Sequence, residues 1–473
     1  MPDGAAPRRP TALVIGASAA GLLATAALAE FAEVTLVERD ALPAGDEPRR
    51  GVPQARHAHL VWSGGVTALG ELLPGFVDTA VARGGRLVHV MGDMVSRAPN
   101  EVWFRRFTAT RHRNLVCSRT LFDAVLRERV LPHRNVTLQQ RTTAVQLLGG
   151  PRRVTGVRVH QGDGTHELTA DLVVDGSGRG SAAPRWLGDL GLPDAAVREV
   201  TAGVAYATRL YRAPGSTGST AFPVVNVQAN PAKPPGRGGI ILPVERGRWL
   251  VTLSGTRGGE PTGDPDSFLA FAHGLGDPVI GELLRHAVPL SAVHTTRATT
   301  NRRRYFERAG RWPDGFLVLG DAVAGFNPVY GHGLTVAAQS ALAVRDVLAT
   351  RALTAVGTAR RLQRAVARPV SAAWDLAVGQ DVFYPGATDT PPTLLDRLNA
   401  RFVDRAVTTG ARNPRALGAL LDVMGLERPP IRLLAPDMLL PMLIGPRTPR
   451  LSAPPLTEAE RAAARPVTAP PHG

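Results

Sequence analysis

The residues best suited to chemistry lie in a small-residue loop between two apolar runs near the start of the sequence. Gly16, Ser18 and Gly21 belong to this loop, and the second apolar run ends in Glu38. This order of strand, tight turn, helix, strand and acid is typical of the βαβ unit that binds dinucleotides. The N–H groups at the helix start would face a pyrophosphate, and the carboxylate would bind ribose hydroxyls.

The same stretch has two other interpretations. One is an alanine-rich core helix after a buried strand. The other is an export signal, because Arg8 and Arg9 precede a small, apolar segment. The glycine turn and the second strand with its acid argue against a signal, since cleavage of the signal would remove the predicted dinucleotide-binding unit. We therefore expect a cytoplasmic protein. A single cysteine, Cys117, excludes an intramolecular disulfide and agrees with a reducing compartment.

Composition excludes several classes of protein. The 473 residues carry a net charge of +15, but all basic residues except Lys233 are arginines, and they are spread along the chain. This distribution does not indicate a nucleic-acid partner. His57 and His59 have no nearby carboxylate or cysteine, so we predict no metal site. The most apolar segment, 431–444, is interrupted by charges and prolines. We interpret it as a packed helix pair and do not expect membrane contact.

Two further segments indicate ligand binding. A buried strand, 315–319, runs into Gly320 and Asp321, and the glycine-rich loop 327–333 leads into a long helix. This pattern places a carboxylate at the carboxyl edge of a sheet and lets backbone approach a flat ligand. Arg119 stands in the first turn of another predicted helix, where it opposes the helix dipole. It either meets an external anion or lies on the surface.

Taken together, these motifs resemble the flavin-dependent monooxygenases of the aromatic-hydroxylase type, with the fold of p-hydroxybenzoate hydroxylase. The chain more narrowly resembles the epoxidases of polyether ionophore biosynthesis, of the lasalocid and monensin type. The narrower resemblance rests on RGVPQARHAH (50–59), VWSGG (61–65), YATRL (206–210), SGTRGGEP (254–261) and FNPVYGHG (326–333). It covers about 11–384 and fades in the last quarter.

The resemblance implies an α/β fold with a Rossmann-like FAD-binding domain, an inserted antiparallel β-sheet substrate domain and a C-terminal helical region. The FAD-binding domain would comprise 1–80, 111–185 and 296–349. The substrate domain would comprise 81–110 and 186–295, followed by C-terminal helices at 350–453 and a flexible tail at 454–473.

The resemblance also assigns cofactor contacts. FAD would lie with its pyrophosphate on the first loop and Arg119, its ribose near Glu38, and its isoalloxazine against Pro328 and the helix start. The residues expected to bind FAD are Gly16, Ser18, Ala19, Ala20, Gly21, Glu38, Arg39, Arg50, Val52, Pro53, Gln54, Arg119, Ala144, Gly178, Gly320, Asp321, Pro328, Gly331, His332, Gly333 and Leu334. Ser177 and Gly178 occupy the position of a family Asp-Gly pair, so the electron source is either NAD(P)H or a separate flavin reductase.

The implied reaction is epoxidation of a small-molecule polyketide polyene, with molecular oxygen as co-substrate, through a flavin C4a-hydroperoxide. Asn327, Pro328 and Tyr330 would line the oxygen-transfer pocket. Residues that alternate along strands would form its roof or pack in the core: Tyr206, Thr208, Leu242, Trp249, Val251 and Leu253. An aromatic hydroxylase of another secondary-metabolite pathway is the alternative. A halogenase would need an active-site lysine, and Lys233 lies in a Pro/Gly loop. A flavin-binding redox sensor would not need so large an inserted sheet.

Overall fold

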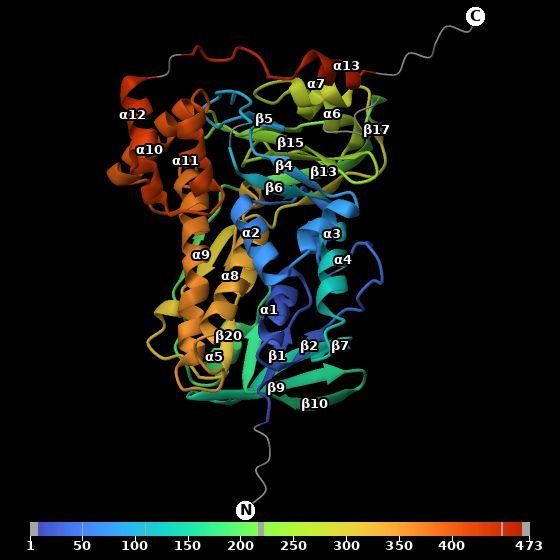
Figure 1. The fold of residues 1–473 in the computed structure, drawn as a ribbon, viewed down its shortest axis with the longest axis vertical. Coiled ribbons are helices and arrows are strands. Elements are labelled where there is room, and N and C mark those ends of the chain that lie inside the picture. Colours follow the sequence, from blue (N-terminus) through green and yellow to red (C-terminus); the bar gives the residue numbers. More distant parts are fainter. Residues whose placement is uncertain (1–7, 50, 109, 216–221, 446–447, 466–473) are drawn as a thin grey trace, which may run out of the picture.

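A five-stranded parallel sheet lies at the centre of one half of the molecule, the half that also contains the helices α1 and α8 (Figure 1). The computed structural model describes residues 8–49, 51–108, 110–215, 222–445 and 448–465. The strand order is β20 (Phe316–Val318), β11 (Leu172–Asp175), β1 (Thr11–Ile15), β2 (Glu33–Glu38) and β7 (Val136–Gln140). All neighbouring pairs are parallel, so their carboxyl ends lie along one edge.

Helices cover this sheet. α1 (Ala19–Ala29) is buried over nearly its whole length, because it packs against α8 (Gly333–Leu348) and α4 (Arg119–Val130). α8 in turn packs against α9 (Thr358–Asp381) and α2 (Ser63–Leu72). The remaining helices of this half are α3 (Phe76–Ala82) and α5 (Ala183–Asp189).

Three smaller sheets flank the central one. An antiparallel sheet of β8 (Thr142–Gly150), β9 (Arg153–Gln161) and β10 (Gly164–Thr169) lies at the end of the molecule near the N-terminus (Figure 1). A second consists of β12 (Val197–Val200), β19 (Asn301–Arg304) and β21 (Ala324–Gly325). A third consists of β3 (Leu60–Val61), β6 (Arg113–Val116) and β4 (Arg86–His89).

A seven-stranded sheet forms the other half of the molecule. It contains β17 (Val288–Pro289), β13 (Ala205–Arg212), β16 (Arg248–Gly255), β15 (Arg237–Val244), β14 (Val224–Val227) and β5 (Met94–Arg97), with β18 (His294–Thr296) paired to β13. The sheet is antiparallel except for the β5–β14 pair, which is parallel. One face packs on α6 (Pro265–His273) and α7 (Val279–Leu284), which leaves the other face toward the rest of the molecule.

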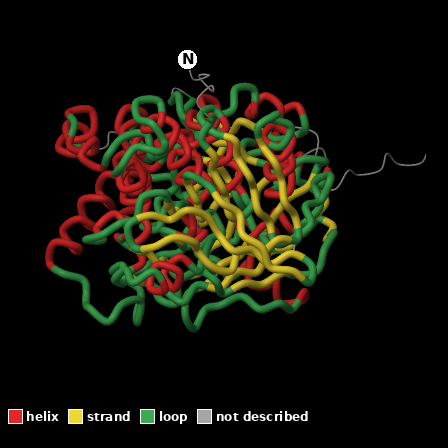
Figure 2. The backbone as a smooth tube through the Cα atoms, turned by 90° about the horizontal axis from the view of Figure 1, so that it is seen from below, coloured by secondary structure: helices red, strands yellow, loops and turns green. Residues whose placement is uncertain are grey.

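The C-terminal helices gather on one side of the strands (Figure 2). They are α10 (Leu394–Gly410), α11 (Pro414–Met424) and α12 (Pro436–Ile444), with a 3-10 turn, η6 (Pro430–Leu434), between the last two. Segment 431–444, predicted to be a packed helix pair, is instead a 3-10 turn and one helix. More than half of the surface is exposed at Ile431, Leu434, Leu440, Leu443 and Ile444. No helix among the described residues is both long and apolar enough to cross a bilayer.

The predicted architecture of parallel sheet, inserted sheet and C-terminal helices is present. Within the predicted flexible tail, 454–473, the structure has a short helix, α13 (Glu458–Ala463), and residues 466–473 lie outside the described residues. A capping box at Thr457 stabilises the start of α13, and Glu460 accepts two hydrogen bonds from Arg106, at 2.6 and 2.8 Å.

Candidate functional site

The first loop is built for close backbone approach to a ligand. Gly16 has φ +96°, and a Cβ added at Gly21 would lie 1.7 Å from the Gly16 carbonyl oxygen. Ser18 is the N-cap of α1 but makes no side-chain capping bond, which leaves N–H groups of the first turn free. Ser18, Ala19 and Ala20 line a large cavity. The loop therefore offers an anion site at a helix start.

Glu38 ends β2 beside this loop and is buried. Its carboxylate accepts the Ala17 N–H at 2.7 Å and pairs with Arg49 at 2.8 Å. The Arg49 Nε is buried and has no partner among the described residues. Sequence reasoning missed Arg49, because it stands in a polar loop without a pattern of its own.

Arg119 reaches the same loop from the start of α4. Its guanidinium donates to Asp123 at 2.8 Å and to the Ser18 hydroxyl at 3.1 Å. The side chain is buried and lines the cavity, so Arg119 is not a surface arginine. Burial, together with the charge of Arg119, lowers the pKa of His59 to about 3, which keeps that imidazole neutral.

Gly320 and Asp321 approach the first loop from β20. Gly320 has φ +65°, and a Cβ added there would lie 2.6 Å from the Ala20 Cβ. Asp321 lies 3.5 Å from the Arg179 guanidinium at the cavity wall. Asp175, in contrast, lies behind the wall, where Ser177 and Ser181 donate to its carboxylate at 2.6 Å each.

The loop 327–333 carries a buried polar network. The Asn327 side chain accepts from the Tyr206 hydroxyl at 2.7 Å and donates to Asp381 at 3.0 Å. Asp381 also accepts from the Tyr330 hydroxyl at 2.5 Å and from the Asn301 amide at 2.7 Å. Burial raises the pKa of Asp381 and holds the pKa values of Tyr206 and Tyr330 well above the usual value.

The end of this loop is fixed by the C-terminal helices. His332 Nε2 lies 3.0 Å from the Met424 carbonyl oxygen, and burial lowers the pKa of His332 to about 4. The Trp62 ring lies 5.8 Å from the His332 ring, tilted by 32°, and its Nε1–H donates to the Tyr330 carbonyl at 3.0 Å. α8 then begins at Gly333 with its N-terminus at the cavity.

The first loop, Arg119, Asp321, the loop 327–333 and the start of α8 line one cavity of about 2100 Å³. The predicted cofactor and catalytic residues on its wall are Gly16, Ser18, Ala19, Ala20, Glu38, Arg39, Val52, Pro53, Gln54, Arg119, Ala144, Gly178, Gly320, Asp321, Asn327, Pro328, Tyr330, Gly331, His332, Gly333 and Leu334. Gly21 lies behind the loop, and Arg50 lies outside the described residues.

The predicted roof needs correction. Tyr206 and Leu242 line the cavity, but Trp249, Val251 and Leu253 pack in the core against α6 and α7. Side chains alternate along a strand, so Thr252 and Ser254 of β16 face the cavity in their place. Thr208 is buried behind the wall, bonded to Thr252 at 2.8 Å and to His57 Nδ1 at 2.7 Å.

No role was predicted for the C-terminal helices, yet they form the wall opposite the sheet. The lining residues that they contribute include Phe402, Val407, Leu420, Val423 and Leu433. Their helical pattern was visible in the sequence, but nothing local indicated which surface they cover.

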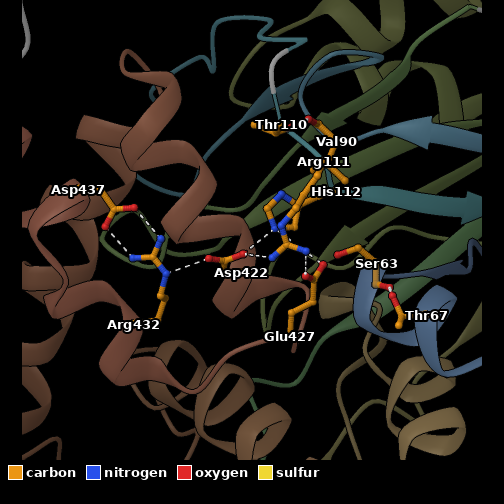
Figure 3. Close-up of polar contacts among 10 residues, drawn as sticks. All are labelled: Ser63, Thr67, Val90, Thr110, Arg111, His112, Asp422, Glu427, Arg432 and Asp437. Atoms are coloured by element: carbon orange, nitrogen blue, oxygen red, sulfur yellow. Dashed lines mark hydrogen bonds and ion pairs between the residues drawn. The ribbon is translucent and has the colours of Figure 1, made fainter.

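A polar cluster outside the cavity holds these helices (Figure 3). His112, Asp422 and Glu427 lie close enough to hold a metal ion, the one such group found among the described residues. Arg111 pairs with both carboxylates, at 2.6 Å to Asp422 and 2.5 Å to Glu427, and Arg432 pairs with Asp422 at 2.9 Å. Arginine therefore already supplies the positive charge at this cluster.

Comparison with known proteins identifies the fold. No protein-family model matches the chain. Solved structures with the same fold include the flavin-dependent brominase Bmp2 (TM-score 0.62, 14% identity, 88% of this chain and 93% of that chain). They also include PqsL, a probable FAD-dependent monooxygenase from Pseudomonas aeruginosa (0.58, 18%, 81% and 100%). A third is the anhydrotetracycline hydroxylase OxyS from Streptomyces rimosus (0.55, 19%, 89% and 76%).

A sequence relative is much closer. Protein Rv3254 of Mycobacterium tuberculosis is 33% identical over 402 residues, which cover 80% of this chain and 82% of the relative. The predicted fold class is confirmed by the structural neighbours. The chain has the fold of flavin-dependent monooxygenases and halogenases, and it belongs to the family of Protein Rv3254.

Proposed function

We propose that this protein is an FAD-dependent monooxygenase that epoxidises carbon–carbon double bonds of a polyketide polyene. The observation that carries the proposal is the continuity of the 2100 Å³ cavity. It joins a dinucleotide cradle at the start of α1 to a large, mainly apolar chamber between the seven-stranded sheet and the C-terminal helices. A long, apolar substrate fits such a chamber better than a small polar one.

The residues at the cradle fit FAD. Free N–H groups of α1, the Arg119 guanidinium and the unpartnered Arg49 Nε together offer donors to a pyrophosphate and its ribose. Gly331 and Gly333 let backbone approach a flat ring. When bound, FAD would supply the oxygen-activating redox chemistry. The chain would hold the ring, orient the alkene and exclude water.

The test of this proposal uses protein reconstituted with FAD. Reduced by NAD(P)H or by a flavin reductase, it is incubated with oxygen and several polyenes, and products are measured by mass spectrometry. We expect one added oxygen atom per reacting alkene. Absence of this gain with every polyene, from protein that holds FAD, would contradict the epoxidase. A protein that never binds FAD would contradict the whole proposal. Reduction by NAD(P)H alone, compared with reduction through the reductase, identifies the electron source.

Aromatic hydroxylation is the second candidate, and the polar network favours it. Tyr206, Asn327 and Tyr330 present hydroxyl and amide groups beside the buried Asp381. Such groups would bind and deprotonate a phenol, whereas alkene epoxidation requires no acid–base pair. The Tyr330→Phe variant distinguishes the two functions. Epoxidation should stay within about tenfold of the wild type, whereas a proton transfer through Tyr330 would be worth roughly 10²–10⁴-fold.

Halogenation has less support. Lys233, the sole lysine, donates to Glu101 at 2.7 Å and does not line the cavity.

A further inference from the structure

Nine large apolar side chains of the C-terminal helices stand in solvent, with exposed fractions between 44% and 76%. We call them the C-terminal patch: Leu394, Leu395, Leu398 and Val403 on α10, Ile431 and Leu434 on η6, and Leu440, Leu443 and Ile444 on α12. These elements pack against one another at one corner of the molecule (Figure 1). So many exposed apolar side chains on neighbouring elements mark an interaction surface.

The patch lies at the mouth of the cavity. Leu398, Val403, Ile431 and Leu434 are exposed, and all four also line the 2100 Å³ cavity. An apolar molecule could therefore move from a partner bound at the patch into the cavity without entering bulk water. The polar cluster of Figure 3 keeps this surface in place, because Arg432 of η6 bonds Asp422 of α11 and Asp437 of α12.

Arginines border the patch. Arg397 and Arg401 of α10 and Arg428 before η6 are exposed, and none of their guanidinium groups has an ion-pair or hydrogen-bond partner among the described residues. Arg428 also lines a second hollow of about 900 Å³, together with Arg361, Arg364 and Arg368 of α9. These three are likewise exposed, and their guanidinium groups have no partner in the part of the chain that the structure describes. The exposed charges of α10 are Arg397, Arg401 and Arg405 against Asp404, so the border has an excess of positive charge.

From this arrangement we infer that the protein binds an anionic lipid surface through the C-terminal patch, with the cavity mouth toward the lipid. Apolar side chains enter the interface while flanking arginines attract lipid headgroups. A second copy of the chain fits less well, since it would bring unpaired arginines together in a molecule with a net charge of +15. The sequence alone argued against membrane contact, because 431–444 cannot span a bilayer. Interfacial binding needs no span, and the exposed side chains come together only after folding.

Vesicle co-sedimentation tests the inference independently of any enzyme activity. The full chain is mixed with phosphatidylcholine vesicles with and without phosphatidylglycerol. We expect binding to the anionic vesicles alone. Because the whole molecule is basic, two pairs of variants separate the patch from general charge attraction. Arg397→Ser/Arg401→Ser is compared with Arg134→Ser/Arg311→Ser, which removes two exposed arginines elsewhere. Leu440→Ser/Leu443→Ser/Ile444→Ser is compared with Val197→Ser/Val288→Ser/Val356→Ser, which removes three exposed valines elsewhere.

Each patch variant should weaken binding by about tenfold or more, and each control should change it by much less. Thermal unfolding checks that every variant remains folded. Three results would overturn the inference: no binding to anionic vesicles, equal loss in patch and control variants, or a dimer in solution that the α12 variant converts to a monomer. The last result would assign the patch to a second copy of the chain.

Discussion

Asp381 is a buried acid whose bonding partners are all uncharged. It accepts hydrogen bonds from Asn301, Asn327 and Tyr330, and it has no ion-pair partner among the described residues. Burial raises its pKa above the ordinary value of 3.8. The folded protein therefore holds this proton more tightly than the unfolded chain does. The contribution of Asp381 to stability is complete below the ordinary pKa and declines as the pH rises through the raised value.

Replacing Asp381 with asparagine should remove this pH dependence. The free energy of unfolding of the wild type contains a term that falls with rising pH, whereas Asp381→Asn should show a flatter profile above pH 4. Thermal unfolding across pH 4 to 8 measures the difference. Asp266→Asn, at an exposed acid, is the control and should follow the wild type. Parallel profiles for Asp381→Asn and wild type would show that Asp381 is not a protonation site of the folded state.

At the scale of elements, two glycines in neighbouring helices should respond oppositely to alanine. Gly21 in α1 has no room, since a Cβ would lie 1.7 Å from the Gly16 carbonyl oxygen. Gly70 in α2 is exposed, and a Cβ there meets nothing within 4 Å.

Gly21→Ala should destabilise the fold by about 1–3 kcal/mol or more and reduce FAD binding, because the turn must open. Gly70→Ala should stabilise it by up to about 1 kcal/mol through helix propensity. Thermal unfolding and the flavin absorbance of purified protein measure both effects. Normal stability and full FAD content in Gly21→Ala would contradict the role of the tight turn.

Sequence reasoning succeeds where a local pattern fixes the backbone. The alternation from apolar strand to glycine turn to helix predicted β1 and α1. It fails where both faces of a strand are buried. In β16 the apolar face of Trp249 and Val251 and the face of Thr252 are both buried, so the alternation separates two faces without indicating which one lines the cavity. Asp381 meets Asn301 across 80 residues, and no local pattern records such a contact.

At the scale of the whole molecule, the C-terminal helices close the cavity, and one acid holds them. Asp422 of α11 accepts from Arg111 at 2.6 Å and from His112 at 2.9 Å, both in the segment before β6 (Figure 3). Its other oxygen accepts from Arg432 at 2.9 Å. Burial acts to raise the pKa of Asp422, but hydrogen bonds from His112 and Arg432 outweigh it, so the pKa is lowered. Its stabilising effect is present above the ordinary pKa and is lost as the pH falls.

Removing this acid should loosen the outer wall of the cavity. Asp422→Ala leaves His112 and two arginines without their shared partner. A loss of about 3 kcal/mol is expected from the His112–Asp422 hydrogen bond, whose side chains are 3% and 10% exposed, while Arg111 and Arg432 keep Glu427 and Asp437. Asp437→Ala is the matched control: it also removes a partner of Arg432, but its side chain is 38% exposed, so the loss should stay below about 1 kcal/mol. Limited proteolysis at neutral pH, followed by mass spectrometry, should show early cleavage between α10 and α12 in Asp422→Ala alone. Equal resistance of the two variants would mean that apolar packing, and not the polar cluster, holds the C-terminal helices against the sheet.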